Sequence, residues 1–351
     1  MPKATVAGPL VTENAVVFSI PDEDRELAQV ALLHELVRPR VVPFERAGDR
    51  FELRLPRPPV DRLEYRIALE RRDGPTDVGL DPTNDLVAPG PLGSKSVVEF
   101  PEYEPSTWVG DDESEPGDIR DLTLPSSLLR TKVTAKIWSA AETDPAQPLP
   151  LLVVHDGPEY AEYSSLVRLL DHLVAFGELP PLRAALIPPP LDRFETYSAS
   201  ARFTRALTEE WLPALQPTIG RPVGLGASLG ALAFLHAHYA KPGCFGGLVL
   251  QSGSFFRRRF DSHESDAPRY ARITRFVSRV GGGQGDAQPI PVTVTCGTGE
   301  ENLANNRWLA ETLADRGWPV ELIEHRDAHN WISWRDSLDP HLADLILRAL
   351  A

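Results

Sequence analysis

The stretch RPVGLGASLGALAFLHAHYA, residues 221–240, places one serine among small residues, in the order Gly226-Ala227-Ser228-Leu229-Gly230. The apolar segment PVGLGA is typical of a buried strand, and LGALAFLHAHYA is typical of a helix. A G-x-S-x-G pattern at a strand-to-helix turn is what a nucleophile elbow requires, because neighbouring backbones pass too close there for side chains. We therefore predict that Ser228 is a nucleophile.

The glycines of this stretch allow two other interpretations. Gly224, Gly226 and Gly230 resemble a dinucleotide-binding loop, which requires an acidic residue at the end of the next strand. That strand, GGLVLQSG, ends in Gln251 and Ser252, which disfavours a dinucleotide. The other interpretation is a structural turn with an inert serine, which the presence or absence of catalytic partners has to decide.

Outward from this stretch, strands alternate with helices from about residue 118 to the C-terminus. Apolar runs of strand length are LPLLVVHDG, LRAALIPPP, GGLVLQSG, PIPVTVTCG and VELIEH, and leucines recur at helical spacing in YSSLVRLLDHLVAFGEL. Such alternation predicts an α/β fold, a doubly wound and mostly parallel sheet with helices on both faces.

Residues 1–110 have a different pattern. Short apolar or alternating segments are separated by Pro, Gly and Asp: NAVVFSIP, QVALLHELV, DRFELRLP, RLEYRIALE and KSVVEFP. In DRFELRLP, the apolar Phe51, Leu53 and Leu55 share one face, as in a half-buried strand. We predict a β-sandwich over residues 1–110, an acidic linker over 111–117 and an α/β domain over 118–351.

Composition narrows the classes of partner. The chain has 351 residues and a net charge of −14, so a broad nucleic-acid surface is not expected, and an anionic substrate would require a local cationic patch. It has no secretory signal pattern and no apolar run of about 20 residues, which predicts a soluble, cytoplasmic protein. Cys244 and Cys296 lack metal-ligand spacing, so we expect reduced thiols and no bound metal or cofactor.

A serine nucleophile needs a histidine base, and in doubly wound hydrolases this base follows the last strands. Only His325, His329 and His341 come late enough in the chain. His341 lies in the final helical pattern and His325 ends the last predicted strand. His329 lies beyond that strand in the loop RDAHNWISW, where a base can reach the serine, so we prefer His329.

The acid that orients the histidine should follow the preceding strand, PIPVTVTCG. Glu300 is the first carboxylate beyond that strand, and Glu301 is its rival, with a role at the start of the next helix as the alternative. Asp327 is close in sequence to His329 and is a weaker candidate. Together, Ser228, Glu300 and His329 disfavour the inert-serine interpretation.

Two backbone amides are candidates for an oxyanion hole. One is the amide of Leu229, directly after the serine, at the N-terminus of a predicted helix. The other should follow the strand that ends in VVHDGPEY. Because Pro158 has no N–H, the donor is Gly157 or Glu159, and the pattern does not choose between them.

Several segments of the second half resemble the esterase-D-type α/β-hydrolases, and within them the enterochelin (ferric enterobactin) esterases. They include LPLLVVHDGPEY, DRFETYS, the Ser228 stretch and CGTGEENLANNRWLAETLADRGWPVELIEHRDAHNWISWRDSL, in the same order over most of residues 118–351. The resemblance implies an α/β-hydrolase that cleaves siderophore esters with Ser228, His329 and Glu300. It also implies an immunoglobulin-like sandwich at the N-terminus, with GLDPTND at 79–85 near its end.

The substrate follows less directly from the residues. A ferric tris-catecholate is anionic, and Arg193 in DRFETYS together with the run Arg257-Arg258-Arg259 are candidates to bind it. The same fold serves feruloyl esterases, general carboxylesterases and acyltransferases, so fold alone does not separate them. A hypothesis of another class is a glycan-binding protein with an inactive hydrolase domain. We expect a small-molecule ester as partner and predict no oligomeric state.

Overall fold

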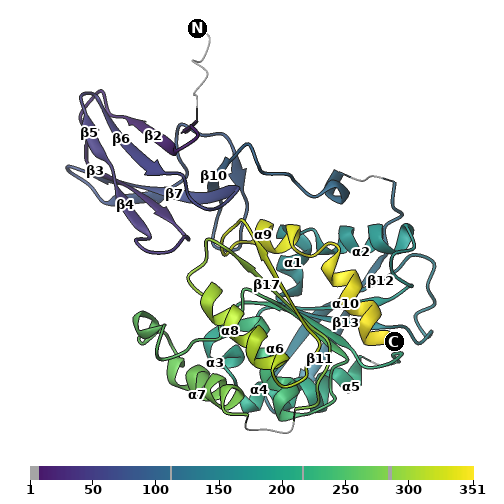
Figure 1. Ribbon diagram of the computed structural model, residues 1–351. Coiled ribbons are helices and arrows are strands. Elements are labelled where there is room, and N and C mark those ends of the chain that lie inside the picture. The colour runs from purple at the N-terminus through teal and green to yellow at the C-terminus, as the bar shows by residue number, and fades with distance from the viewer. Residues whose placement is uncertain (1–7, 111–112, 216, 284–286) are drawn as a thin grey trace. The chain divides into compact units, whose positions relative to one another are not determined.

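The computed structural model describes residues 8–110, 113–215, 217–283 and 287–351, which fall into two compact units (Figure 1). The first unit holds the described residues up to Glu104 and two short segments, Gly297–Glu301 and His325–Ser333. The second holds Pro105–Cys296, Asn302–Glu324 and Trp334–Ala351. The predicted division into 1–110 and 118–351 misses this interleaving, because sequence pattern does not show which turns pack on a distant part of the chain.

The first unit contains two antiparallel sheets. One has the order β1-β2-β6-β5, with β1 (Leu10–Val11), β2 (Ala15–Pro21), β5 (Glu45–Ala47) and β6 (Arg50–Pro56). The other has the order β4-β3-β7-β10-β9, and β8 also pairs with β7; its strands are β3 (Leu27–His34), β4 (Val41–Pro43), β7 (Arg62–Arg71), β8 (Thr76–Gly79), β9 (Val87–Ala88) and β10 (Lys95–Glu99). The five strands predicted here are present, and the strands missed are short.

The two sheets share one apolar core, so the first unit contains a sandwich. Phe18 of β2 meets Tyr65 of β7 edge to face, with ring centroids 5.0 Å apart. Along β6, Phe51 and Leu53 are buried between exposed neighbours, as the alternation predicted. The immunoglobulin-like assignment of this sandwich stays a prediction.

The second unit is built on an eight-stranded sheet with the order β11-β12-β14-β13-β15-β16-β17-β18. Its strands are β11 (Asp118–Ser126), β12 (Thr131–Ser139), β13 (Leu151–His155), β14 (Arg183–Ile187), β15 (Val223–Ala227), β16 (Gly247–Gln251), β17 (Val292–Gly297) and β18 (Val320–His325). Pairing is parallel from β14 through β13, β15 and β16 to β17, and antiparallel at β11 and β12. The sheet is mostly parallel, as predicted, and β11, which was not predicted, begins directly after the predicted linker 111–117.

Helices and short helical turns connect these strands. They are η1 (Thr107–Gly110), α1 (Gly157–Tyr163), α2 (Leu166–Ala175), α3 (Arg193–Tyr197), α4 (Ala201–Arg205), the π-helical η2 (Ala206–Trp211), α5 (Leu212–Ala214), α6 (Leu229–Ala240), η3 (Ser262–Glu264), α7 (Tyr270–Gly281), α8 (Leu303–Ala314), α9 (Trp331–Asp336) and α10 (His341–Leu350). The π-helical turn η2 separates α4 from α5. In the described part of the chain, no helix combines the length and apolarity that a bilayer crossing requires.

The central strands of this sheet position the site. Every residue of β13, β14, β15 and β16 is buried. Helix α6 packs on β15 and β16, α10 packs on β16, and α1 packs on β14. Strands buried on both faces must be apolar throughout, which explains the continuous apolar runs in the sequence. Polar residues are then free to gather only at the strand ends.

Candidate active site

Ser228 occupies a strained turn between β15 and α6. Its backbone angles are φ 55° and ψ −121°, in a region that residues with a side chain rarely adopt. Such a conformation costs roughly 1–3 kcal/mol and persists only where surrounding contacts enforce it. Here the Ser228 amide donates to the Gln251 carbonyl at 2.9 Å, and the Ser254 amide donates to the Ser228 carbonyl at 3.1 Å. Neighbouring strand ends therefore hold the serine in the geometry of a nucleophile elbow.

Space requires two glycines of this stretch, Gly226 of the motif and Gly224 before it. A Cβ at Gly226 would lie 2.8 Å from the carbonyl carbon of Gly230, which is backbone and cannot move aside. A Cβ at Gly224 would lie 2.8 Å from the Phe234 ring, so that glycine serves core packing. The Ser228 Oγ lies 3.1 Å from the Ser254 Oγ. The sequence interpretation of G-x-S-x-G as an elbow agrees with this backbone.

The amides predicted for an oxyanion hole begin two helices at one edge of the sheet. Leu229 is the first residue of α6, and Gly157 is the first residue of α1, so neither amide has an acceptor within its helix. Their helices follow β15 and β13, which are parallel neighbours. A Cβ at Gly157 would lie 2.3 Å from the Leu186 Cα, which explains a glycine at this turn. Glu159, the rival donor, lies two residues further into α1.

Arg193, predicted to contact substrate, is bound to a buried carboxylate. Its Nη1 lies 2.7 Å from Oδ2 of Asp156, the residue directly before Gly157. The Tyr197 hydroxyl also donates to Asp156, at 3.3 Å. Burial raises the pKa of Asp156, and the Arg193 charge opposes that shift. These contacts show that Arg193 stabilises the turn that carries Gly157, and its contact with substrate stays a prediction.

His155 is a buried residue whose contacts the sequence did not reveal. Its ring stacks on Phe234 at 3.7 Å between centroids, and its Nδ1 lies 3.1 Å from the Gly230 carbonyl oxygen. Burial lowers its pKa to about 3, so the ring is neutral at physiological pH. It ties the end of β13 to the first turn of α6, the two turns that carry the candidate oxyanion amides.

A buried polar network also lies beside the elbow. The Gln251 side chain accepts from the Tyr160 hydroxyl at 2.7 Å and donates to the Trp334 carbonyl at 3.0 Å. The Trp334 indole in turn donates to the Ser252 hydroxyl at 2.9 Å. The available signal was Gln251 itself, a polar residue that ends an apolar strand. The network fixes the turn whose carbonyl receives the Ser228 amide.

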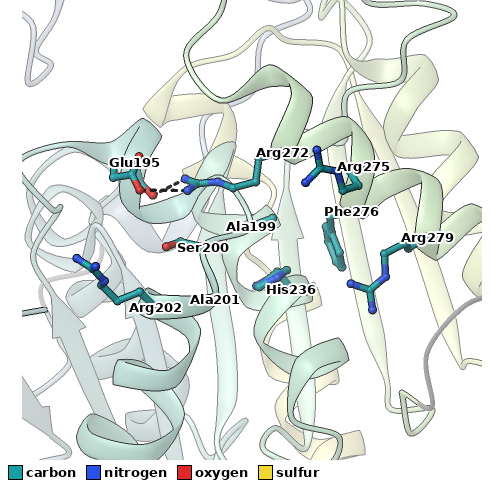
Figure 2. A pocket seen from close by; sticks show the side chains of 10 residues that line it. All are labelled: Glu195, Ala199, Ser200, Ala201, Arg202, His236, Arg272, Arg275, Phe276 and Arg279. Carbon is teal, nitrogen blue, oxygen red and sulfur yellow. Dashed lines mark hydrogen bonds and ion pairs between the residues drawn. The ribbon is translucent and has the colours of Figure 1, made fainter. Parts of the chain in front are cut away.

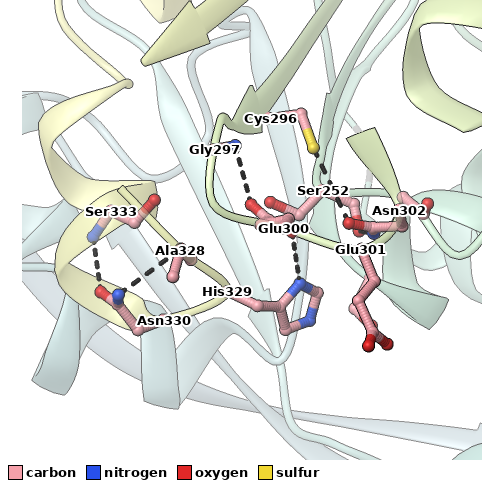
Figure 3. A network of polar contacts seen from close by, with 12 residues as sticks. Ser252, Cys296, Gly297, Glu300, Glu301, Asn302, Ala328, His329, Asn330 and Ser333 are labelled. Atoms are coloured by element: carbon pink, nitrogen blue, oxygen red, sulfur yellow. Dashed lines mark hydrogen bonds and ion pairs between the residues drawn. The ribbon is translucent and has the colours of Figure 1, made fainter. Parts of the chain in front are cut away.

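The first unit brings Glu300 and His329 together (Figure 3). The His329 Nδ1 lies 2.8 Å from Oε2 of Glu300, and the Gly297 amide donates to Oε1 at 2.8 Å. The Glu300 side chain is almost fully buried, whereas about a third of the His329 side chain is exposed. This is the arrangement in which a carboxylate orients an imidazole.

The electrostatics of this pair favour the charged imidazole. Burial acts to lower the pKa of His329, but the Glu300 carboxylate outweighs it and the net pKa is raised. Glu35 acts in the same direction and Lys95 against it. A raised pKa is useful to a general base, because the imidazolium that forms during proton transfer is stabilised.

The rivals of Glu300 and His329 have other partners. Glu301 forms ion pairs with Arg40 at 2.6 Å and with Arg38 at 3.2 Å. The His325 Nε2 lies 2.6 Å from the Ser333 hydroxyl. Of the candidate acids, Glu300 is the one with a described contact to His329.

Asp327 supports the loop that carries His329. Its Oδ1 accepts from the Ala328 amide at 2.7 Å and from the Asn330 side chain at 3.0 Å. Burial raises the pKa of Asp327 to about 7, against the opposing charge of Arg62. The Asp327 carboxyl group therefore stabilises the 327–330 loop through hydrogen bonds within it.

Backbone contacts join the sandwich to both segments. The Val37 amide donates to the Gly299 carbonyl at 3.1 Å, and the Asp61 amide donates to the Arg326 carbonyl at 2.6 Å. Ala328 lies in the apolar core of the sandwich. The N-terminal part of the chain thus supports the residues around the candidate acid and base, a role that periodicity does not show.

The arginine run has mixed surroundings. Arg257 packs its guanidinium over the rings of Phe260 and Trp308, at 4.7 and 4.3 Å from their centroids. Arg258 and Arg259 are exposed, and Arg259 lies 5.6 Å from the Phe260 centroid. The structure thus separates Arg257, which packs on aromatic rings, from its exposed neighbours.

The mostly parallel eight-stranded sheet and its strained serine turn define an α/β-hydrolase fold. No protein-family model matches the chain. It is 31% identical over 222 residues to the iron(III) enterobactin esterase of Dickeya dadantii (strain 3937), covering 58% of this chain but only 49% of that relative. It is 25% identical over 299 residues to the iron(III) enterobactin esterase of Escherichia coli O6:H1, covering 82% and 72%.

Solved structures show the same relationship at the level of the fold. The enterobactin esterase of Shigella flexneri, solved in the presence of enterobactin, has a TM-score of 0.75 and 22% identity, covering 96% of this chain and 95% of that one. The ferric enterobactin esterase of Salmonella typhimurium has a TM-score of 0.76 and 21% identity, covering 98% and 97%. A ferulic acid esterase has a TM-score of 0.55 and 18% identity, covering 66% and 99%. The predicted resemblance to the enterochelin esterases is confirmed, and these named relatives are carboxylic ester hydrolases.

Proposed function

We propose that this protein is a serine esterase that hydrolyses the ester bonds of a catecholate siderophore, with Ser228, His329 and Glu300 as its triad. The observation that carries the proposal is the strained backbone of Ser228, which is enforced by hydrogen bonds with Gln251 at the end of β16 and with Ser254 just after it. A structural turn has no need of a non-glycine residue in this conformation, whereas a nucleophile elbow does.

The order of the strands supports a single site for Ser228, Glu300 and His329. Ser228 directly follows β15, and Glu300 comes three residues after the end of β17. Strands β15, β16 and β17 are parallel neighbours, so their carboxyl ends lie at one edge of the sheet. Ligands and catalytic groups of open α/β sheets gather at that edge. His329 is tied to Glu300 by the 2.8 Å contact.

The proposed reaction has two half-reactions. His329 takes the hydroxyl proton of Ser228 as Oγ attacks the ester carbonyl carbon, and the amides of Leu229 and Gly157 stabilise the oxyanion. The C–O bond to the alcohol then breaks, and His329 returns the proton to the leaving oxygen. Water attacks the acyl-enzyme in the same way and releases a carboxylate. Glu300 holds the His329 ring and stabilises its charged form throughout.

The siderophore substrate is supported by the extent of the similarity. The enterobactin esterase structures cover nearly the whole chain, whereas the ferulic acid esterase leaves about a third of it without a counterpart. A ferric tris-catecholate is anionic, and the exposed Arg258 and Arg259 offer cations that lack an acidic partner within the described residues. A feruloyl or simple carboxylic ester is the second candidate, which the shared hydrolase fold favours.

A panel of esters tests the proposal. Hydrolysis of enterobactin, with and without iron, is compared with that of a feruloyl ester and p-nitrophenyl butyrate by chromatography or absorbance. We expect kcat/KM to be highest for the siderophore. A higher value for the feruloyl or butyryl ester would assign a general carboxylesterase. A fluorophosphonate probe should label Ser228, and an unlabelled protein without hydrolysis of any ester would instead support the glycan-binding hypothesis.

A further inference from the structure

A second concave site lies among the helices of the second unit (Figure 2). It has a volume of about 490 Å³. Its lining comes from the segments before and within α4, from α6 and from α7: Glu195, Ala199, Ser200, Ala201, Arg202, His236, Arg272, Arg275, Phe276 and Arg279. Ser228 is not among these residues. His236 is eight residues further along α6, which corresponds to roughly 12 Å of helix.

The charges of this pocket are unbalanced. Glu195 is its only acidic lining residue, and that carboxylate is paired with Arg272 at 3.1 Å and with Arg269 from outside the pocket. Arg272 also donates to backbone carbonyls of α3 and of the residue after it, so its role is structural. Within the described residues, three lining arginines have no ion pair with an acidic residue, in a chain whose net charge is −14: Arg202, Arg275 and Arg279.

Two of these arginines stand on one face of α7. Arg275 and Arg279 are four residues apart and project toward the side where His236 of α6 lies (Figure 2). Like charges at this spacing destabilise a helix. Throughout the ranges that the structure describes, neither guanidinium has a hydrogen-bond or ion-pair partner. The chain as a whole is acidic, yet it places these two cations side by side in one pocket. Grouped guanidinium groups of this kind can bind an anion.

The pKa of His236 is affected by the positive charges of this pocket. Burial first, and then the charges of Arg279 and Arg272, lower its pKa to about 4. Its Nδ1 lies 2.7 Å from the Thr204 hydroxyl, and its ring meets Phe276 edge to face at 4.9 Å. The pocket therefore has the rings of His236 and Phe276 beside its guanidinium groups. Such a lining can bind an organic anion as well as an inorganic one.

We propose that this pocket binds a small molecule through a phosphate or carboxylate group held by Arg275 and Arg279, with Arg202 at the opposite side. Guanidinium groups bind both oxyanions with paired, parallel hydrogen bonds. Two sources share this chemistry: a phosphate compound, and the carboxylate released by ester hydrolysis. Only the second source rests on the proposed function, so failure of the esterase proposal would leave the site itself in place.

Titration calorimetry on the full chain tests the site. The probes are inorganic phosphate, N-benzoylserine and N-benzoylserinamide, at low and at high ionic strength. We expect saturable binding of at least one anion, weakened at least tenfold in the double variant Arg275→Gln/Arg279→Gln. The amide, which lacks both the carboxylate and an ester bond that the protein could hydrolyse, should bind at least tenfold more weakly than N-benzoylserine if the carboxylate is the ligand.

The double variant Arg54→Gln/Arg130→Gln is the matched control, since it removes the same charge from exposed arginines elsewhere. It should change anion affinity less than twofold. Equal weakening in both double variants would overturn the site in favour of non-specific attraction, and so would the absence of saturable binding for both anions. Binding of phosphate alone would identify a phosphate compound as the source. Circular dichroism confirms that each variant is folded.

Discussion

The turn of the proposed nucleophile and the proposed acid–base pair are built in opposite ways. The turn at Ser228 is made from residues close in sequence, with glycines at 226 and 230 and a helix that begins at the next residue. Glu300 and His329 are 29 residues apart, and their segments are held by contacts to the first hundred residues, such as those of Val37 and Asp61. One part is encoded locally, and the other depends on the fold.

This difference bears on what each part contributes. The turn stores backbone strain that the surrounding strand ends must offset, so its geometry is rigid. The acid–base pair rests on hydrogen bonds and ion pairs whose strength changes with protonation. Substitutions at the turn should therefore remove the chemistry outright, whereas substitutions around the pair should change its pH dependence.

The largest expected effect is at the turn. Ser228→Ala removes the attacking oxygen and should lower kcat on every ester by a factor on the order of 10⁴–10⁶. The thermal midpoint should stay near that of the unchanged protein, because alanine takes the same space. Ser254→Ala is the matched control, since it removes only the hydroxyl 3.1 Å from Ser228 Oγ, and it should retain most activity. More than a tenth of the original rate in Ser228→Ala would refute the nucleophile.

The second effect is at the acid. Glu300→Gln should lower kcat by roughly 10²–10⁴, because the neutral amide neither fixes the imidazole tautomer nor stabilises its charge. The Glu300 carboxylate raises the pKa of His329, so its loss should lower that pKa. A base must be neutral to act, and the acid limb of the kcat/KM profile should therefore move to lower pH.

Glu301→Gln provides the comparison for this variant. Its carboxylate is paired with Arg38 and Arg40, and exposed ion pairs contribute only about 0–1 kcal/mol. Its rate and its pH profile should remain close to those of the unchanged protein. If the two variants lost activity alike, or if the acid limb stayed in place in Glu300→Gln, the acid would have to be sought elsewhere.

The smallest expected effect on activity is at Asp327, where the change should appear in the free energy of unfolding and its pH dependence. Asp327 has a folded pKa of about 7, above the unfolded value, so the folded state binds more protons and stability falls as pH rises from about 4 to 7. The slope approaches about 1.4 kcal/mol per pH unit for one group. Asp327→Asn keeps an oxygen for both loop hydrogen bonds and should remove this contribution. Denaturation in urea at pH 4.5, 5.5 and 7 measures it.

The exposed Asp73→Asn is the control for that experiment. Its stability curve should run parallel to that of the unchanged protein, while the Asp327→Asn curve should be flatter. Parallel curves for all three proteins would show that Asp327 titrates normally in the fold.

The sequence predicted much of the second unit because burial imposes a recognisable pattern. Strands covered on both faces are apolar throughout, as in LPLLVVHDG, and the strands and helices predicted there occur in the predicted order. The sequence did not predict β11 or α7, although the buried apolar residues of α7 follow helical spacing: Ile273, Phe276, Val277 and Val280. It also divided the chain once, although the acid and histidine segments belong to the first unit.

The sequence by itself determined the turn at Ser228, since Gly226 is required by close contact with the Gly230 backbone and the spacing of the motif is fixed along the chain. It also reduced the acid and the base to a few residues beyond two strands. Only the tertiary structure separates them, because Glu300 and Glu301 are adjacent and differ in where their side chains find partners. It likewise pairs Arg193 with Asp156, and within the described residues it gives Arg275 and Arg279 no acidic partner, because charge pairing depends on distances in space that spacing along a chain does not contain.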